Sequence, residues 1–157
     1  MPQKICAFTG HRYIPDEMVV RLPEMLDSLL EELIADGFCE FRCGGAQGFD
    51  TIAALKVLEK KKLYGDKIKL VLYLPCKDQT RGWSENAKRA YSIVLERADR
   101  IFYAAEFYNS GCMHARNRAL VDQSNLCVAL CLSSQGGTAY TVLYAKKQGV
   151  PVRMLSF

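Results

Sequence analysis

Short, almost purely apolar runs alternate along this chain with segments in which apolar residues recur every three or four positions. The runs at 70–74 and 128–132 contain no charged residue, and they are far shorter than the roughly 20 residues of a membrane span. Continuous apolar strands are typical of a parallel sheet that is covered on both faces. We therefore expect an α/β fold: a Rossmann-like, doubly wound, mainly parallel sheet with helices on both faces.

The expected elements alternate from one end of the chain to the other. Strands are predicted over 4–8, 38–43, 68–74, 101–105, 126–132 and 150–155. Helical spacing fills the intervals, with Pro23 as the start of regular helix or a kink, Gly37 as a stop and Ser84 as an N-cap. No linker or repeat interrupts the pattern, so a single Rossmann-like domain over 1–157 is expected.

Composition excludes several classes of protein. The chain has 157 residues and 50% hydrophobic content, enough to form a core without a metal or disulfide. Its seven cysteines are odd in number and lack zinc-type spacing, which favours free thiols in a cytoplasmic protein. The start Met1-Pro2-Gln3-Lys4 leads directly into a strand, so no signal peptide is expected. We expect neither a membrane partner nor a metal.

The net charge of +4 is concentrated in one segment. Residues 56–69 carry six Lys against Glu59 and Asp66, and the rest of the chain is balanced. Lysine near a helix C-terminus is favoured by the helix dipole, so we interpret this segment as a solvated helix face. A nucleic-acid partner is therefore not expected, because such a partner usually requires basic residues spread over a binding face.

The residues that follow each predicted strand are the candidates for a ligand site, because ligands of doubly wound sheets bind beyond the carboxyl ends of the strands. Two of these junctions are double-glycine loops that open a helix, where free backbone N–H groups suit a phosphate. Neither loop matches GxGxxG or GxxxxGK[ST]. The candidates near the first two strands are Thr9, Gly10, His11, Arg12, Gly44, Gly45, Ala46, Gln47, Gly48 and Asp50. The later ones are Pro75, Gln79, Trp83, Tyr108, Arg116, Asn117, Asp122, Gly136, Gly137 and Thr138.

Each polar candidate has two interpretations at this stage. Arg12 offers a fork of donors to a phosphate or carboxylate, or pairs with a surface carboxylate. His11 braces its loop or binds ligand, which we favour over proton transfer. Asp50 either holds loop N–H groups or contacts a ribose hydroxyl. Trp83 stacks on a base or packs against the protein.

Helix position and side-chain size lead to two further expectations. Arg116 and Asn117 are about 100° apart on a helix, so we expect one at the pocket and the other bracing a loop. Gly45→Val or Gly137→Val is expected to abolish nucleotide binding and to leave the fold largely intact, because a branched side chain blocks a ligand's approach to the backbone.

The ordered set of junctions resembles the YpsA-like family of small bacterial proteins, within the SLOG superfamily that includes the Smf/DprA and LOG proteins. The resemblance covers essentially the whole chain. It is carried by Thr9-Gly10-His11-Arg12, by residues 44–51, by Tyr108 with Arg116-Asn117 and Val121-Asp122, and by Gly136-Gly137-Thr138 with Tyr144-Ala145. It implies a Rossmann-like fold and a pocket for a nucleotide or nucleotide-derived ligand lined by the glycine loops.

Two loops resemble different branches of the superfamily. Residues 44–51 look like the corresponding loop of DprA proteins, which bind single-stranded DNA. Residues 136–138 look like the phosphate loop of LOG enzymes, which release a base from a nucleoside monophosphate. The LOG pattern places a catalytic Glu three residues after its Thr, where this chain has Thr141, and a hydroxyl cannot replace that carboxylate. Asp50, Glu85 and Asp122 remain as other carboxylates.

The expected function is therefore binding of a nucleotide or a nucleotide derivative by a sensor or regulatory module without catalysis of the LOG type. A nucleotide, NAD or an ADP-ribose derivative is the expected class of bound molecule. The alternatives are an N-glycosidic hydrolase or transferase acting on nucleoside monophosphates, and single-stranded DNA binding of the DprA type. No catalytic residue is assigned, and formation of a homo-oligomer stays open.

Overall fold

A computed structural model describes residues 3–157. Met1 and Pro2, which belong to the segment from which no signal peptide was expected, lie outside the described residues. In this part of the chain six strands form one sheet in the order β4-β3-β2-β1-β5-β6, and every neighbouring pair is parallel. The strands are β1 (Lys4–Gly10), β2 (Phe38–Cys43), β3 (Lys69–Leu74), β4 (Arg100–Tyr103), β5 (Leu126–Leu130) and β6 (Val152–Met154).

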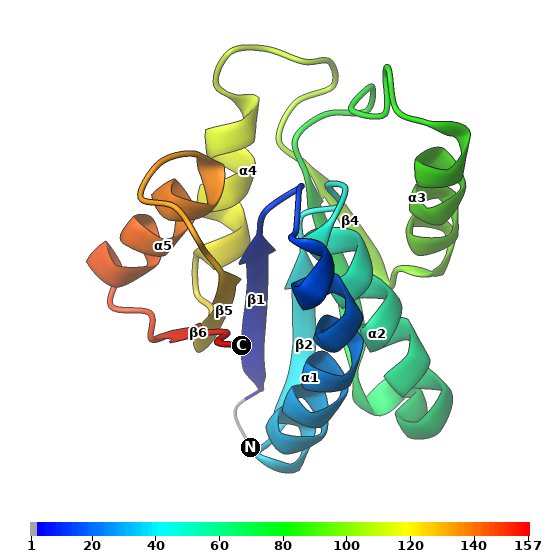
Figure 1. Ribbon diagram of the computed structural model, residues 1–157, viewed down its shortest axis with the longest axis vertical. Helices are drawn as coiled ribbons and strands as arrows, with labels where there is room; N and C mark the ends of the chain where they lie inside the picture. Colours follow the sequence, from blue (N-terminus) through cyan, green and yellow to red (C-terminus); the bar gives the residue numbers. More distant parts are fainter. Residues whose placement is uncertain (1–2) are drawn as a thin grey trace.

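Helices cover both faces of the sheet, which confirms the predicted fold class. Figure 1 shows α1, α2 and α3 on one side of the sheet and α4 and α5 on the other. The helices are α1 (Asp16–Ala35), α2 (Phe49–Tyr64), α3 (Glu85–Arg97), α4 (Cys112–Val121) and α5 (Gly137–Lys147), with a short 3-10 turn at Gly65–Lys67. Among residues 3–157, no helix has the length and apolar character needed to cross a membrane.

The points at which helices and strands begin or end are set by side-chain capping and by the pairing of neighbouring strands. Ser84 is an N-cap as predicted, since its Oγ accepts a hydrogen bond from the Ala87 N–H at 3.1 Å. Pro23, in contrast, lies inside α1 and does not begin it. β5 ends at Leu130, before the predicted end at 132, because its partner β1 ends at Gly10, which pairs with Leu130.

The core lies mainly between the sheet and the layer of α1 and α2. The rings of Phe8 on β1, Phe41 on β2 and Phe49 on α2 are fully buried. The centroid of Phe8 lies 6.2 Å from that of Phe41 and 6.3 Å from that of Phe49. Phe49 thus anchors the start of α2 over β1 and fixes the loop that joins β2 to α2.

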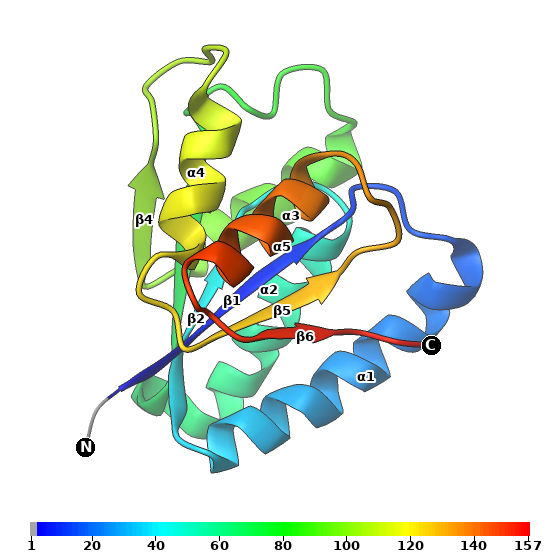
Figure 2. The same ribbon diagram turned by 90° about the vertical axis from the view of Figure 1, so that its left-hand side faces the viewer.

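The strand order creates a crevice at the carboxyl ends of the central strands. From β1 the chain proceeds outward through β2 and β3 to β4, and it then returns to place β5 on the other side of β1. The loops after β1 and β5 therefore leave the sheet toward opposite faces, α1 on one and α5 on the other (Figure 2). Such a switch point is where open α/β sheets bind ligands.

The basic segment is only in part the solvated face that the sequence suggested, because Lys62, Lys67 and Lys69 are exposed and Lys60 is not. Lys60 is only 4% exposed, and its Nζ lies 2.8 Å from both Asp27 Oδ1 and Glu31 Oε1 on α1. Lys61 Nζ lies 3.0 Å from Asp99 Oδ2. Packing of α1 against α2 leaves the Lys60 ammonium group beside two carboxylates, so the interpretation of a solvated face is wrong for Lys60.

We predict that Lys60→Glu destabilises the protein, because it places a third carboxylate against Asp27 and Glu31 in a poorly solvated position. Thermal unfolding followed by circular dichroism should show a midpoint lower by about 5 °C or more. The control is Lys62→Glu, which makes the same change at an exposed position of α2 and should leave the midpoint close to that of the wild type. Equal midpoints for the two variants would contradict the role of the Lys60 ion pairs.

Candidate functional site

A cavity of about 370 Å³ lies in the crevice at the switch point. Its wall combines the loop after β1, the start of α2, one face of α4 and the first turn of α5. The lining residues are Thr9, Gly10, His11, Arg12, Ala46, Asp50, Met113, His114, Arg116, Asn117, Leu120, Gly137 and Thr138. We call this cavity the cleft.

The structure brings many of the predicted site residues together in the cleft and leaves others elsewhere. Gln79 and Tyr108 line a second cavity, of about 280 Å³, which also includes Arg12. A larger groove of about 630 Å³ lies between α1 and β6, but none of the predicted residues lines it. The predicted residues that line neither the cleft nor the second cavity are Gly44, Gly45, Gln47, Gly48, Pro75, Trp83, Asp122 and Gly136.

One face of α4 forms a wall of the cleft. Met113, Arg116, Asn117 and Leu120 all line it, at the spacing of three, four and seven residues that places side chains on one face of a helix. The expected division between Arg116 and Asn117 holds only in part, because both line the cleft and Arg116 also bonds to the loop after β2. The same spacing was the signal in the sequence that would have identified Met113 and Leu120.

Arg116 joins α4 to the glycine loop after β2. Its guanidinium is buried; Nε donates to Asn117 Oδ1 at 2.6 Å, and Nη1 donates to the Gly44 carbonyl and, at 3.5 Å, to the Tyr73 carbonyl. These acceptors come from α4 and from the ends of β2 and β3. The side chain is thus a buried crosslink between three elements and also part of the cleft wall.

Asp50 is the acidic group in the floor of the cleft. Its carboxylate is 6% exposed, and Oδ2 accepts a hydrogen bond from the Ala46 N–H at 3.2 Å. Burial raises the pKa of Asp50 to about 6, and the charge of Arg116 and the Ala46 N–H oppose that rise only in part. Of the two roles open from the sequence, the structure shows the one of holding the loop backbone.

The glycines of the loop after β2 are required by packing inside the protein. A Cβ at Gly45, where φ is +70°, would overlap the Leu74 side chain, and one at Gly44 would lie 2.7 Å from both Arg116 Nη1 and Asp50 Oδ2. Gly45→Val is therefore expected to destabilise the fold, in contrast to the expectation from the sequence that it leaves the fold largely intact. The physical reason is that the bare Cα faces the core and the cleft floor at these positions.

Gly136 and Gly137 have a different environment. A Cβ at Gly136 would meet nothing within 4 Å, and one at Gly137 would make only an ordinary contact, 3.7 Å from Asn117 Nδ2. The first backbone N–H groups of α5 have no partner within the helix. The start of α5 is thus open at Gly137, which lies at the rim of the cleft; Thr138 beside it is buried and also lines the cleft.

His11 is held by the loop after β5. Its Nε2 accepts a hydrogen bond from the Leu132 N–H at 2.7 Å. An imidazole that accepts at Nε2 is neutral and carries its proton on Nδ1. The ring therefore braces the loops after β1 and β5, which is one of the two roles, structural or ligand-binding, that were favoured over proton transfer.

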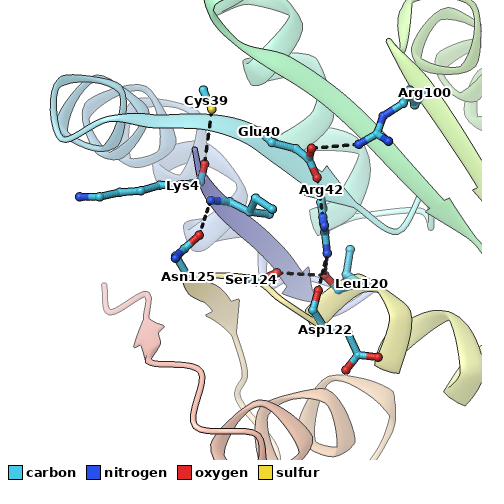
Figure 3. Close-up of polar contacts among 10 residues, drawn as sticks. Lys4, Cys39, Glu40, Arg42, Arg100, Leu120, Asp122, Ser124 and Asn125 are labelled. Atoms are coloured by element: carbon cyan, nitrogen blue, oxygen red, sulfur yellow. Dashed lines mark hydrogen bonds and ion pairs between the residues drawn. The ribbon is translucent and has the colours of Figure 1, made fainter. Parts of the chain in front are cut away.

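Three other sequence candidates lie away from the cleft, and two of them have structural partners there. Trp83 packs edge-to-face on Tyr91, with ring centroids 5.4 Å apart. Asp122 lies at the opposite end of α4, where its Oδ1 accepts from the Tyr144 hydroxyl at 2.6 Å and its carbonyl accepts from Arg42 at 2.7 Å (Figure 3). Glu85 is exposed at the start of α3.

Cys112 and His114 do not form part of a metal centre in the described structure. Cys112 is buried, and the His114 ring stacks on Tyr140 with centroids 4.0 Å apart. Across residues 3–157, no three His, Cys, Asp or Glu side chains come close enough together to hold a metal ion. All seven cysteines are free thiols.

We predict that alanine destabilises the protein at one glycine loop and has little effect on stability at the other. Gly45→Ala should lower the free energy of unfolding by about 2 kcal/mol or more, because the new methyl group overlaps Leu74 at a positive φ. Gly137→Ala, the matched change in open space, should alter it by about 0.5 kcal/mol or less. Urea unfolding at neutral pH measures both values; a stable Gly45→Ala variant would be incompatible with the packing described above.

The raised pKa of Asp50 leads to a prediction of how the free energy of unfolding depends on pH. Because its pKa is higher in the folded protein than in the unfolded chain, the neutral carboxyl favours folding; this contribution is complete below about pH 4 and is lost as the pH rises through about 6. The shift of roughly two units corresponds to about 3 kcal/mol. The free energy of unfolding of the wild type minus that of Asp50→Asn should thus fall by up to that amount between pH 4 and pH 7.

The same urea series with Glu96→Gln, a matched change at an exposed site on α3, controls for changes in overall charge. The difference between the wild type and this variant should stay nearly constant over the same range. A constant difference for Asp50→Asn as well would show that Asp50 titrates alike in both states.

Comparisons with known proteins agree with this fold and sequence pattern. The chain is 31% identical over 144 residues to the uncharacterized SPbeta prophage-derived protein YoqJ of Bacillus subtilis strain 168, a match that covers 82% of each chain. It is 25% identical over 158 residues to a UPF0398 protein of Bacillus thuringiensis strain Al Hakam, covering 93% of this chain and 84% of the relative.

Solved structures of DNA processing protein A (DprA) share the fold. The protein from Streptococcus pneumoniae superposes with a TM-score of 0.69 at 15% identity, over 99% of this chain and 50% of the other. The one from Helicobacter pylori, whose structure concerns its single-stranded DNA binding mode, gives 0.69 at 22% identity, over 99% and 66%. The YpsA model, described as the YspA SLOG family, matches residues 10–155. The chain therefore belongs to the YpsA family of SLOG proteins.

Proposed function

We propose that this protein binds a phosphate-containing, nucleotide-type ligand in the cleft and acts as a sensor or regulatory domain. The observation that carries the proposal is the open start of α5, which lies at the rim of the same cavity as the Arg12 side chain. Within residues 3–157 the Arg12 guanidinium has neither a hydrogen bond nor an ion pair with the protein. A helix N-terminus and a free guanidinium on one cavity favour an anion.

The cleft has the size and the polar groups that such a ligand requires. Its volume of about 370 Å³ is within the usual range for small-molecule sites, roughly 300–1,000 Å³. Thr138 supplies a hydroxyl at the start of α5, and Asn117 supplies an amide from α4. These neutral groups suit the oxygen atoms of a phosphate or a ribose.

Binding is favoured over cleavage of the LOG type by the surroundings of Thr141. This residue is fully buried, and its hydroxyl donates to the Gly137 carbonyl at 2.8 Å. Among the residues described, Asp50 is the one acidic group that lines the cleft, and it is held by the loop backbone. A glycosidic cleavage normally uses a pair of carboxylates, so the cleft supports recognition better than hydrolysis.

Single-stranded DNA is a second candidate, favoured by the fold shared with DprA of Helicobacter pylori. Against it stands the engagement of Lys60 and Lys61 with carboxylates, which leaves less of the basic segment free for phosphates. The two candidates differ in their salt dependence, since contacts with many phosphates weaken steeply as salt rises.

The proposal is tested by calorimetric titration of the protein with adenosine monophosphate, NAD, ADP-ribose and a short single-stranded oligonucleotide. At least one of the three small ligands should bind, and Arg12→Gln should weaken its binding about tenfold or more, because a charge-assisted hydrogen bond is lost. Gly137→Val should weaken it similarly by covering the start of α5. Both variants should retain the thermal stability of the wild type.

Arg89→Gln, the same change at an exposed position of α3, is the matched control and should bind like the wild type. Wild-type affinity in both the Arg12 and Gly137 variants would overturn the placement of the phosphate. Binding of the oligonucleotide alone, lost between 50 and 200 mM salt, would favour the DNA candidate.

A further inference from the structure

The second cavity adjoins the cleft at Arg12. Arg12 and Met113 line both spaces, so these two side chains form the boundary between them. Alone, the second cavity of about 280 Å³ falls just below the usual size of a ligand site, whereas the two together are well within it. The geometry therefore suits a ligand with two parts, one on each side of Arg12.

The two cavities differ in chemistry. The cleft has the start of α5, whereas the second cavity has the Tyr108 ring, the Cys76 and Met113 side chains, and polar groups from Asp78, Gln79 and Arg81. An aromatic face, apolar walls and a few polar groups at the edge are the means by which proteins hold a nucleobase. The Asp78 carboxylate, whose pKa is lowered chiefly by a hydrogen bond with Cys76, offsets part of the positive charge that Arg12 and Arg81 bring to the second cavity.

Tyr108 is carried on a loop that is held in place without a ligand. Its N–H donates to Asp78 Oδ1 at 3.0 Å, and the Lys77 N–H donates to the Glu106 carbonyl at 2.9 Å. These bonds tie the loop after β4 to the loop after β3. The Tyr108 side chain is nevertheless 66% exposed, so its ring is available to a ligand.

We propose that the ligand is a nucleoside 5′-phosphate whose phosphate lies at the start of α5 and whose base enters the second cavity and stacks on Tyr108. Arg12 lies between the two parts and contacts the phosphate side. This inference rests on the proposed function, because it extends the ligand out of the cleft.

The test compares adenosine monophosphate with ribose 5-phosphate, which lacks the base, by calorimetric titration of the full chain. The wild type should bind the nucleotide more tightly. Tyr108→Ala should weaken nucleotide binding about tenfold or more, the usual scale of a base–aromatic stack, and leave ribose 5-phosphate affinity unchanged. Tyr108→Phe keeps the ring and should bind like the wild type.

Phe107→Ala is the matched control, because Phe107 lies beside Tyr108, is also 66% exposed and lines neither cavity; it should bind both compounds like the wild type. Equal wild-type affinity for the two compounds, or equal weakening of both by Tyr108→Ala, would overturn the base site and leave the phosphate site standing. If no phosphate compound binds, the proposed function fails and this inference with it.

Discussion

The buried guanidinium of Arg116 is the interaction on which the cleft depends. It reaches from α4 to the Gly44 carbonyl at the end of β2 and to the Tyr73 carbonyl at the end of β3. A buried charge is costly unless it is compensated by hydrogen bonds and an opposite charge. The backbone carbonyls, Asn117 and the nearby Asp50 provide that compensation, and in doing so they fix the distance between α4 and the glycine loop.

The glycine loop after β2 passes close to the buried Arg116 and Asp50 side chains. At Gly44 only a hydrogen atom fits beside the Arg116 and Asp50 side chains, so the loop can pass close to them. The result is a cleft with an acidic floor and cationic or N–H donors at its rim, from Arg12 and the start of α5. The one carboxyl group that lines the cleft lies in the floor, where it holds the loop backbone and where the charge of Arg116 offsets its own.

The sequence predicted the type of fold and much of the cleft, but it did not distinguish what each glycine does. The double glycines after β2 and before α5 have the same pattern in the sequence. In the structure, the first pair packs against Leu74 and Arg116, whereas the second lies in open space. Sequence also gave no sign that Lys60 is buried between Asp27 and Glu31. Both facts depend on which elements pack together, and local periodicity carries no information about that.

By itself, the sequence determined the alternation of strands and helices, the parallel sheet and the set of junctions from which a site is built, because burial on both faces demands continuous apolar strands and helical spacing marks the covering layers. Only the tertiary structure decided which junctions meet. The reversal of strand order at β1 brings Thr9, Asp50 and Thr138 to one cavity. Asp122 follows helix α4 and precedes β5, so it lies at the end of the sheet where the strands begin, opposite to the cleft, and its carboxylate accepts a hydrogen bond from Tyr144.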